Sequence, residues 1–292
     1  MNEIEHVLEV GNEVGESPIW MPDEQALYWI DIEGCKVFKY TPSTNDLKTF
    51  EVDFPITSLW SCADGRWITA SKTGLYYWDS KTGKSEFILD PEADAEGLRC
   101  NDGAVDRQGR FLVGTINEVV YDSPDGSIYR YDGGESIVKL DGGFACSNGI
   151  GFSPDGKTLY AADSFNNRIR VYDYDTATGA VSGCRDFATI AAEDGFPDGL
   201  IVDSEGFVWN AHWAGGRIRR YDPSGKMERE IKLPVANTTC LAFGGEQMDE
   251  LYITTAWFMM SDEQRKESPT AGDLFRIKTD VKGLAEPMFK GL

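Results

Sequence analysis

The sequence has few basic residues and very few histidines. Its 28 Lys and Arg stand against 49 Asp and Glu, which gives a net charge of −21, and only two His are present. A surface this acidic repels phosphate backbones, so we expect no nucleic acid among the partners. Most of the acidic surplus is typical of a solvated surface.

Long hydrophobic runs are also missing. No apolar stretch approaches the ~20 residues of a membrane-spanning helix. Residues 1–6, MNEIEH, have neither the basic start nor the apolar core of a signal peptide. We therefore expect a cytoplasmic protein with no membrane partner.

The cysteines are not paired by spacing, since no CxxC motif occurs. We therefore expect free and mostly buried thiols, and no metal site built from cysteines. The six residues are Cys35, Cys62, Cys100, Cys146, Cys184 and Cys240.

What the sequence does contain is a repeated hairpin. At residues 153–156 a Ser-Pro-Asp-Gly turn separates two short apolar segments, a pattern typical of a tight turn between two strands. Related hairpins begin near residues 16, 57, 102, 148, 198 and 239. Each is followed by a third segment in which apolar and polar residues alternate, and by a more variable fourth segment.

This repeat predicts the fold. Four strands in an interval of roughly 40 to 50 residues are typical of one blade of a β-propeller. Six copies predict an all-β chain whose residues 1–292 form a single six-bladed β-propeller domain with four-stranded antiparallel blades. The N-terminal segment 6–10 is expected to complete the last blade beside residues 287–289 and to close the ring.

One position of the repeat is polar in every copy. The first strand of each propeller blade lines the central channel, so side chains at one end of these strands converge near the axis. The converging residues are predicted to be Glu16, Thr57, Asp102, Asn148, Asp198 and Thr239. Any one of them could be a turn residue, because Asp and Asn before Gly are common in turns. Clustered carboxylates, however, repel one another unless a cation lies among them, which predicts a site for a hard divalent cation.

Other polar residues flank this predicted site. Arg99 and Asn101 lie just before Asp102 in the sequence. Beside a cation they suit the binding of a polyhydroxylated or anionic small molecule. A surface salt bridge is the alternative for Arg99.

His212 has no second His nearby, which favours a structural position or one at the rim of the channel. The segment 257–264 is expected to form a lid or a rim loop that selects the substrate. The chain has no G-x-S-x-G motif and no evident Cys–His pair, so a covalent hydrolase is not supported.

Several motifs together resemble the SMP-30/gluconolactonase/LRE-like family. They are GESPIW at 15–20, RCNDG at 99–103, GT at 114–115, SNGI at 147–150, PDG at 197–199 and AHW at 211–213. They span nearly the whole chain in the order found in that family. The resemblance implies a six-bladed propeller in which the metal ligands are Glu16, Asn148 and Asp198. It also implies that Arg99 and Asn101 bind the substrate, and that Asp102 lies behind the ligands.

The chain departs from the family pattern at one position. Some members carry a substrate-binding Glu shortly after the Gly-Thr motif, and here Val119 occupies that position, next to Glu118. Either Glu118 substitutes for that residue or the contact is missing. The exact sugar therefore stays open.

The resemblance implies a metal-dependent lactonase that hydrolyses a sugar-derived aldonolactone, of the glucono-, xylono-, arabinono- or galactonolactone type, to the aldonic acid. One divalent cation would polarise the lactone carbonyl, with Ca²⁺ as the first expectation and Zn²⁺, Mn²⁺, Mg²⁺ or Fe²⁺ as alternatives. Asp198 would act as the general base. Two other functions stay open: a phosphotriesterase-like hydrolase on the same metal, and a non-catalytic cation-binding or scaffold propeller. The oligomeric state is not predicted.

Overall fold

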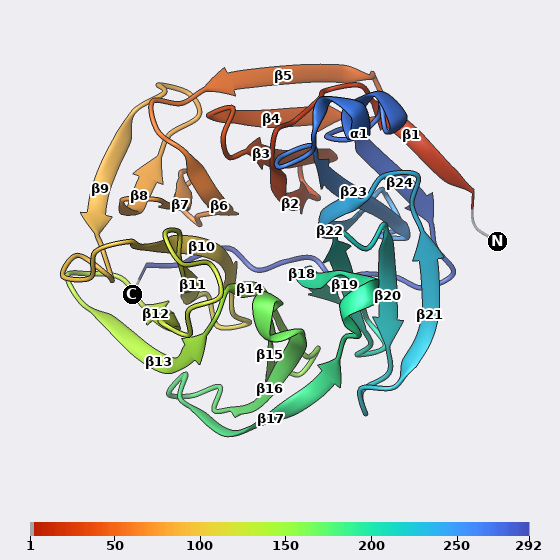
Figure 1. Ribbon diagram of the computed structural model, residues 1–292. Helices are drawn as coiled ribbons and strands as arrows, with labels where there is room; N and C mark the ends of the chain where they lie inside the picture. Colours follow the sequence, from red (N-terminus) through yellow and green to blue (C-terminus); the bar gives the residue numbers. More distant parts are fainter. Residues whose placement is uncertain (1–2, 292) are drawn as a thin grey trace.

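The computed structural model describes residues 3–291, and nearly all of its regular structure is β-strand. Six four-stranded antiparallel sheets are arranged as a ring about a central axis (Figure 1). This confirms the predicted six-bladed propeller. Across residues 3–291, no helix is long and apolar enough to cross a membrane. All six cysteines are free thiols, and four of them are buried.

The blades follow one another along the chain. Blade 1 contains β2 (Gly15–Met21), β3 (Ala26–Asp31), β4 (Lys36–Thr41) and β5 (Asp46–Glu51). Blade 2 contains β6 (Ile56–Ser61), β7 (Trp67–Ser71), β8 (Gly74–Trp78) and β9 (Ser85–Leu89). Blade 3 contains β10 (Leu98–Val105), β11 (Phe111–Asn117), β12 (Gly126–Tyr131) and β13 (Ile137–Phe144).

The second half of the ring repeats this order until its last blade. Blade 4 contains β14 (Ser147–Phe152), β15 (Thr158–Asp163), β16 (Arg168–Tyr174) and β17 (Val181–Thr189). Blade 5 contains β18 (Phe196–Val202), β19 (Val208–Trp213), β20 (Arg217–Tyr221) and β21 (Met227–Lys232). Blade 6 contains β22 (Asn237–Gly244), β23 (Glu250–Ala256), β24 (Leu274–Lys278) and β1 (Ile4–Leu8). The helical turns are η1 (Ser164–Asn166), η2 (Ala192–Asp194) and α1 (Asp262–Glu267).

The first strands of neighbouring blades contact one another around the axis. These inner strands are β2, β6, β10, β14, β18 and β22. They are largely buried, whereas outer strands such as β5 and β9 are mostly exposed. Apolar and aromatic side chains fill the space between blades, for example Trp209 against Phe243, with ring centroids 6.0 Å apart. The alternating pattern of the repeat thus buries one face of each sheet against the next blade.

The ring is closed by the N-terminal strand, as predicted. β1 pairs with β24 in antiparallel register, so the last blade combines both ends of the chain. The second half of that prediction is wrong, because residues 287–289 do not lie beside β1. The backbone of Phe289 bonds instead to Ser61 and Ala63 in blade 2. β1 already occupies the free edge of β24, so the following segment crosses to the other side of the ring.

This crossing segment, residues 279–291, covers the mouth of the channel opposite the site described below. Along it, backbone hydrogen bonds join Lys282 to Ser204 and Lys290 to Gly109. Glu286 forms an ion pair with Arg107 at 3.1 Å. Figure 1 shows the segment passing behind the centre of the ring toward the C-terminus. The segment therefore ties together blades that are distant in the chain.

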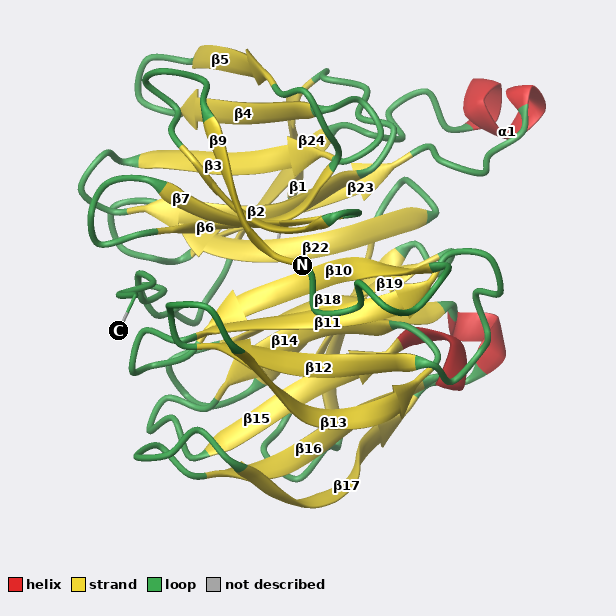
Figure 2. Cartoon of the chain, turned by 90° about the vertical axis from the view of Figure 1, so that its left-hand side faces the viewer, coloured by secondary structure: helices red, strands yellow, loops and turns green. Residues whose placement is uncertain are grey.

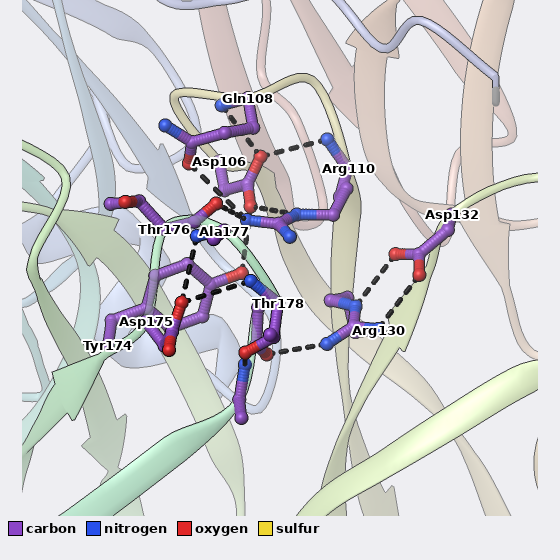
Figure 3. A network of polar contacts seen from close by, with 12 residues as sticks. Asp106, Gln108, Arg110, Arg130, Asp132, Tyr174, Asp175, Thr176, Ala177 and Thr178 are labelled. Carbon is purple, nitrogen blue, oxygen red and sulfur yellow. Dashed lines mark hydrogen bonds and ion pairs between the residues drawn. The ribbon is translucent and has the colours of Figure 1, made fainter.

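Polar contacts also join blades 3 and 4 on this side (Figure 3). Asp106, in the turn after β10, is fully buried and accepts hydrogen bonds from Arg110 Nε at 2.6 Å and from the Tyr174 hydroxyl at 2.7 Å. Arg110 also donates to the carbonyl of Thr176 at 2.9 Å, and Arg130 donates to that of Gly179 at 2.6 Å. Side chains of blade 3 thus bind the loop after β16 in blade 4.

Candidate functional site

A cavity of about 440 Å³ opens at the mouth where the six inner strands begin. The short helical turns and α1 lie on this same face of the propeller (Figure 2). Among the residues that line the cavity are Glu16 of β2, Asp102 of β10, Asn148 of β14 and Asp198 of β18. The structure therefore brings together the four oxygen-bearing side chains that the repeat placed near the axis.

A β-bulge or similar irregularity in each inner strand affects the direction in which these side chains point. The pairing register of the first two strands shifts in all six blades, at Glu16/Ile19, Ile56/Ser58, Cys100/Gly103, Asn148/Ile150, Pro197/Leu200 and Thr238/Leu241. Such bulges bend a strand and redirect its side chains. In these blades the shift falls at or beside the polar position of the repeat.

The glycines that follow the polar residues allow the inner strands to approach closely. Gly149 has a φ of +34°, and a Cβ built on it would lie 2.4 Å from the carbonyl oxygen of Asp198. A Cβ on Gly199 would lie 2.3 Å from Cys240 Sγ in the next blade. A side chain at either position would force neighbouring blades apart. The Asn-Gly and Asp-Gly pairs are therefore needed for packing at the axis.

A chain of hydrogen bonds links the predicted substrate-binding residues to the predicted ligands. Arg99 Nη1 donates to Asn101 Oδ1 at 3.0 Å. Asn101 Nδ2 in turn donates to Asn148 Oδ1 at 3.2 Å. Asn148 Nδ2 donates to Asp198 Oδ1 and, at 3.3 Å, to Ser164 Oγ. The four predicted residues thus form one connected polar network along the cavity.

The carboxylates here are buried and repel one another. Burial, together with repulsion from Asp198 and Asp102, raises the pKa of Glu16 well above its usual value. Burial and repulsion from Asp102 likewise raise the pKa of Asp198 well above its usual value. Burial raises the pKa of Asp102 to about 6, although the Gly103 backbone N–H donates to its carboxylate at 2.7 Å. A positive charge at this position would relieve the repulsion.

The donor set suits a hard cation. Across residues 3–291, no three His, Cys, Asp or Glu side chains are grouped as a metal site, and the third predicted ligand is the amide of Asn148. Oxygen donors from two carboxylates and an amide are those preferred by Ca²⁺ and Mg²⁺. Cys146 also lines the cavity, but burial raises its pKa to about 12, so its thiol stays protonated.

The two threonines of the predicted ring differ from each other. Thr57 lines the cavity, as expected. Thr239 is not among the lining residues; it is fully buried, and its hydroxyl contacts the carbonyl of Gly15 and Thr254 Oγ1. Thr239 therefore adds no surface to the cavity. Its small hydroxyl finds its partners within blade 6 and in blade 1.

Glu118 and Val119 differ in their contacts: Glu118 is ion-paired, and Val119 is exposed to solvent. Glu118 accepts a hydrogen bond from Arg99 Nε at 2.9 Å, and Lys72 Nζ lies 3.7 Å from the same carboxylate. Val119 is 74% exposed. Of the two residues near the family's Glu position, only Glu118 is joined to a predicted substrate-binding residue.

His212 is buried away from the cavity. Its Nδ1 lies 3.0 Å from the carbonyl oxygen of Asp194, whereas its Nε2 has no partner within the described residues. Burial lowers the pKa of His212 to about 4, and the nearby Arg219 and Arg217 add to this effect. This agrees with the structural reading of His212 and not with a position at the rim.

The sequence reasoning missed most of the apolar residues of the cavity. Phe165, Phe196 and Trp213 line it, together with Phe258 and Met259 of the predicted rim loop. Trp213 belongs to the AHW motif at 211–213, and no motif contains Phe165 or Phe196. Their one signal is position: Phe196 begins and Trp213 ends the hairpin of β18 and β19, and Phe165 lies two residues after β15.

The chain matches known proteins over most of its length. The family described as "SMP-30/Gluconolactonase/LRE-like region" matches residues 14–257. Regucalcin of Xenopus laevis is 35% identical over 296 aligned residues, covering 99% of this chain and 98% of the relative. The 6-deoxy-6-sulfogluconolactonase of Pseudomonas putida is 34% identical over 280 residues, covering 95% of each chain.

The similarity extends to a solved structure. A structure from Agrobacterium tumefaciens, described as a calcium-binding protein, regucalcin, superposes with a TM-score of 0.93. It is 29% identical, and the match covers 99% of this chain and 98% of that chain. The similarity therefore includes all six blades.

Proposed function

Because the chain belongs to the SMP-30/gluconolactonase/LRE-like family, we propose that it is a metal-dependent lactonase that hydrolyses a sugar-derived aldonolactone to its aldonic acid. The observation that carries the proposal is the group of three buried carboxylates, Glu16, Asp102 and Asp198, with the partly buried Asn148, all lining an open cavity. The Pseudomonas putida relative, a sulfogluconolactonase by name, supports lactone hydrolysis.

Glu16, Asn148 and Asp198 would hold one divalent cation. Their oxygen donors and the repulsion between the two carboxylates fit a hard cation, and the description of the Agrobacterium tumefaciens relative as calcium-binding favours Ca²⁺. Zn²⁺, Mn²⁺, Mg²⁺ or Fe²⁺ are the alternatives to test. Such a cation polarises a carbonyl group and stabilises negative charge on its oxygen.

The chain's own groups would bind the substrate and move the proton. Arg99 and Asn101 would donate hydrogen bonds to the hydroxyl groups of the sugar and orient the lactone ring. Asp198 would accept a proton from water as the water oxygen attacks the lactone carbon. The ring C–O bond then breaks, and the leaving oxygen takes up a proton to become a hydroxyl group. The product is the open-chain aldonic acid.

The test is acid release from glucono-, galactono-, xylono- and arabinonolactone. The chelated protein is assayed alone and after each divalent metal is added back. We expect hydrolysis to disappear with chelator and to return with one metal. Asp64→Asn, an exposed change far from the cavity, serves as the control and should behave like wild type.

One alternative is favoured by a specific observation. The Agrobacterium tumefaciens relative is described by calcium binding and not by a reaction. If folded protein binds Ca²⁺ but hydrolyses no lactone with any metal, the chain is a non-catalytic cation-binding propeller. Calcium binding measured by calorimetry on the same samples separates this outcome from an inactive preparation.

A further inference from the structure

Four aromatic side chains form one side of the cavity; we call them the aromatic wall. They are Phe165 of η1, Phe196 at the start of β18, Trp213 at the end of β19, and Phe258 in the loop after β23. All four are partly exposed, and all line the cavity that contains Glu16 and Asp198. They come from blades 4, 5 and 6, which are consecutive in the ring.

Ring packing, strand pairing and backbone hydrogen bonds hold the residues of the aromatic wall in place. The rings of Phe165 and Phe196 meet edge to face, with centroids 5.3 Å apart. Phe196 and Trp213 are paired across β18 and β19. The backbone of Phe258 is fixed at both ends, since its N–H donates to the carbonyl of Glu13 at 3.0 Å and its carbonyl accepts from Asn237 at 3.3 Å.

Blades 1 to 3 make the other side of the cavity. It combines polar and charged side chains with a few apolar ones, which are Val14, Ile32, Ile116 and Tyr121. Its two cations are already paired. Lys72 Nζ lies 2.9 Å from a Glu33 carboxylate oxygen. Arg99 Nε lies 2.9 Å from Glu118 Oε2. Both cations therefore have a carboxylate partner before any ligand binds. The polar groups of this side suit hydroxyl groups. The aromatic wall, which Tyr121 extends at a centroid distance of 6.2 Å from Phe165, suits an apolar group.

The cavity also has room for more than a lactone ring. Its volume of about 440 Å³ lies within the range of roughly 300–1,000 Å³ typical of sites for drug-sized ligands. One sugar ring can stack on one or two aromatic faces, which leaves the rest of the wall without a contact. We propose that the physiological substrate is a lactone that carries an apolar substituent, aryl or alkyl, packed against the aromatic wall.

This inference rests on the proposed lactonase function and names its substrate class. The lactone carbonyl would lie near Glu16 and Asp198, with the ring hydroxyl groups toward Arg99 and Asn101. Phe196 lies only two residues before Asp198 in the sequence. The aromatic wall therefore begins directly beside the position proposed for the lactone carbonyl. The substituent then adds binding contacts that an unsubstituted aldonolactone lacks.

The experiment compares the aldonolactone hydrolysed fastest with a derivative of it in which one exocyclic hydroxyl is benzylated. We expect kcat/KM to be at least about tenfold higher for the benzyl derivative, as apolar pockets discriminate by this order. Trp213→Ala and Phe258→Ala should each lower this ratio by about tenfold. The matched control is Phe87→Ala, an aromatic side chain that is 56% exposed on β9 of blade 2, and it should leave the ratio unchanged.

The outcomes separate this inference from the proposed function. A benzyl derivative hydrolysed no faster than its parent overturns the inference and leaves the lactonase in place. The inference is also overturned if the preference in kcat/KM for the benzyl derivative is unchanged in both Trp213→Ala and Phe258→Ala. If no lactone is hydrolysed by folded, metal-loaded protein, the proposed function and the inference both fail.

Discussion

The side-chain amide of Asn148 donates a hydrogen bond to the Asp198 carboxylate, although both residues are proposed to hold the same cation. The amide thereby places a partial positive charge against a carboxylate that is buried and repelled by Asp102. Rotation of the terminal amide exchanges its N–H groups for its oxygen. With its N–H group toward Asp198, the amide stabilises the ionised carboxylate without a cation, and with its oxygen turned toward the axis it can bind a cation.

The first prediction concerns Asp198. Asp198→Asn should lower kcat/KM for the aldonolactone by about 10²–10⁴-fold, the usual contribution of a general base. Asp198→Ala should abolish turnover. The fold should survive Asp198→Asn, because an amide oxygen still accepts from Asn148, and circular dichroism with a thermal melt checks this. Wild-type rates in both variants would contradict the proposed role.

The second prediction concerns Glu16 in metal-free protein. Its raised pKa means that the unfolded chain ionises this group at lower pH than the folded chain does, so stability falls as pH rises above about 4.5. At pH 8, Glu16→Gln should therefore raise the free energy of unfolding by about 1–3 kcal/mol, the usual cost of an uncompensated buried group. Urea titrations measure the change.

The same variant should lose its response to calcium. A bound cation stabilises the wild type by RT ln(1 + [L]/Kd), which is about 2.7 kcal/mol at one hundred times Kd. Glu16→Gln removes one donor, so its melting temperature should change little on calcium addition. Glu86→Gln, at an exposed side chain, is the control and should keep the full response. An undiminished response in Glu16→Gln would exclude it as a ligand.

The repeat was enough to predict the fold and the converging polar residues, because each hairpin carries its own turn signals and alternation. Glu16, Asp102, Asn148 and Asp198 occupy equivalent positions in successive copies, and ring closure brings such positions together. What the repeat could not predict is the set of contacts between blades. Thr239 contacts Gly15 of blade 1 as well as Thr254 of its own blade, and the backbone of Phe289 bonds to blade 2. No local pattern encodes such contacts.

The third prediction concerns the buried ion pair of Asp106 and Arg110, which lies in blade 3 at its contact with blade 4 (Figure 3). Arg110→Ala leaves the fully buried Asp106 without its cationic partner, which should cost about 3–5 kcal/mol of unfolding free energy. Tyr174→Phe removes one neutral donor to the same carboxylate and should cost only about 1 kcal/mol. Arg66→Ala breaks an exposed pair and should cost less than about 1 kcal/mol. Equal losses in the three variants would contradict this ranking.

The fourth prediction is a pH dependence from His212. The unfolded chain binds a proton at this residue near pH 6.5, but the folded chain does so only near pH 4, because burial lowers the pKa. Protons therefore favour the unfolded state as the pH falls between these values. Relative to His212→Asn, the wild type should lose about 2 kcal/mol of unfolding free energy between pH 7 and pH 5.

Urea titrations of both proteins across this range measure that difference. Asparagine is the matched replacement, because its Nδ2 can donate to the carbonyl of Asp194 as Nδ1 of the histidine does. Other groups that titrate in this range are common to both proteins and cancel in the comparison. Parallel pH profiles would mean that His212 binds its proton at the same pH in the folded and unfolded chains, which would contradict the prediction.

The last prediction tests the C-terminal segment as a tie across the ring. Phe289 is 2% exposed and packs against Tyr131, with ring centroids 5.7 Å apart, whereas its neighbour Met288 is 46% exposed. Phe289→Ala should cost about 3–5 kcal/mol of unfolding free energy through the cavity it leaves, and Met288→Ala should cost less than about 1 kcal/mol. Because Phe289 lies at the mouth opposite the candidate site, kcat/KM should stay within about twofold of wild type at temperatures where the variant is folded. A Phe289→Ala protein as stable as Met288→Ala would mean that the segment covers the channel without holding the blades together.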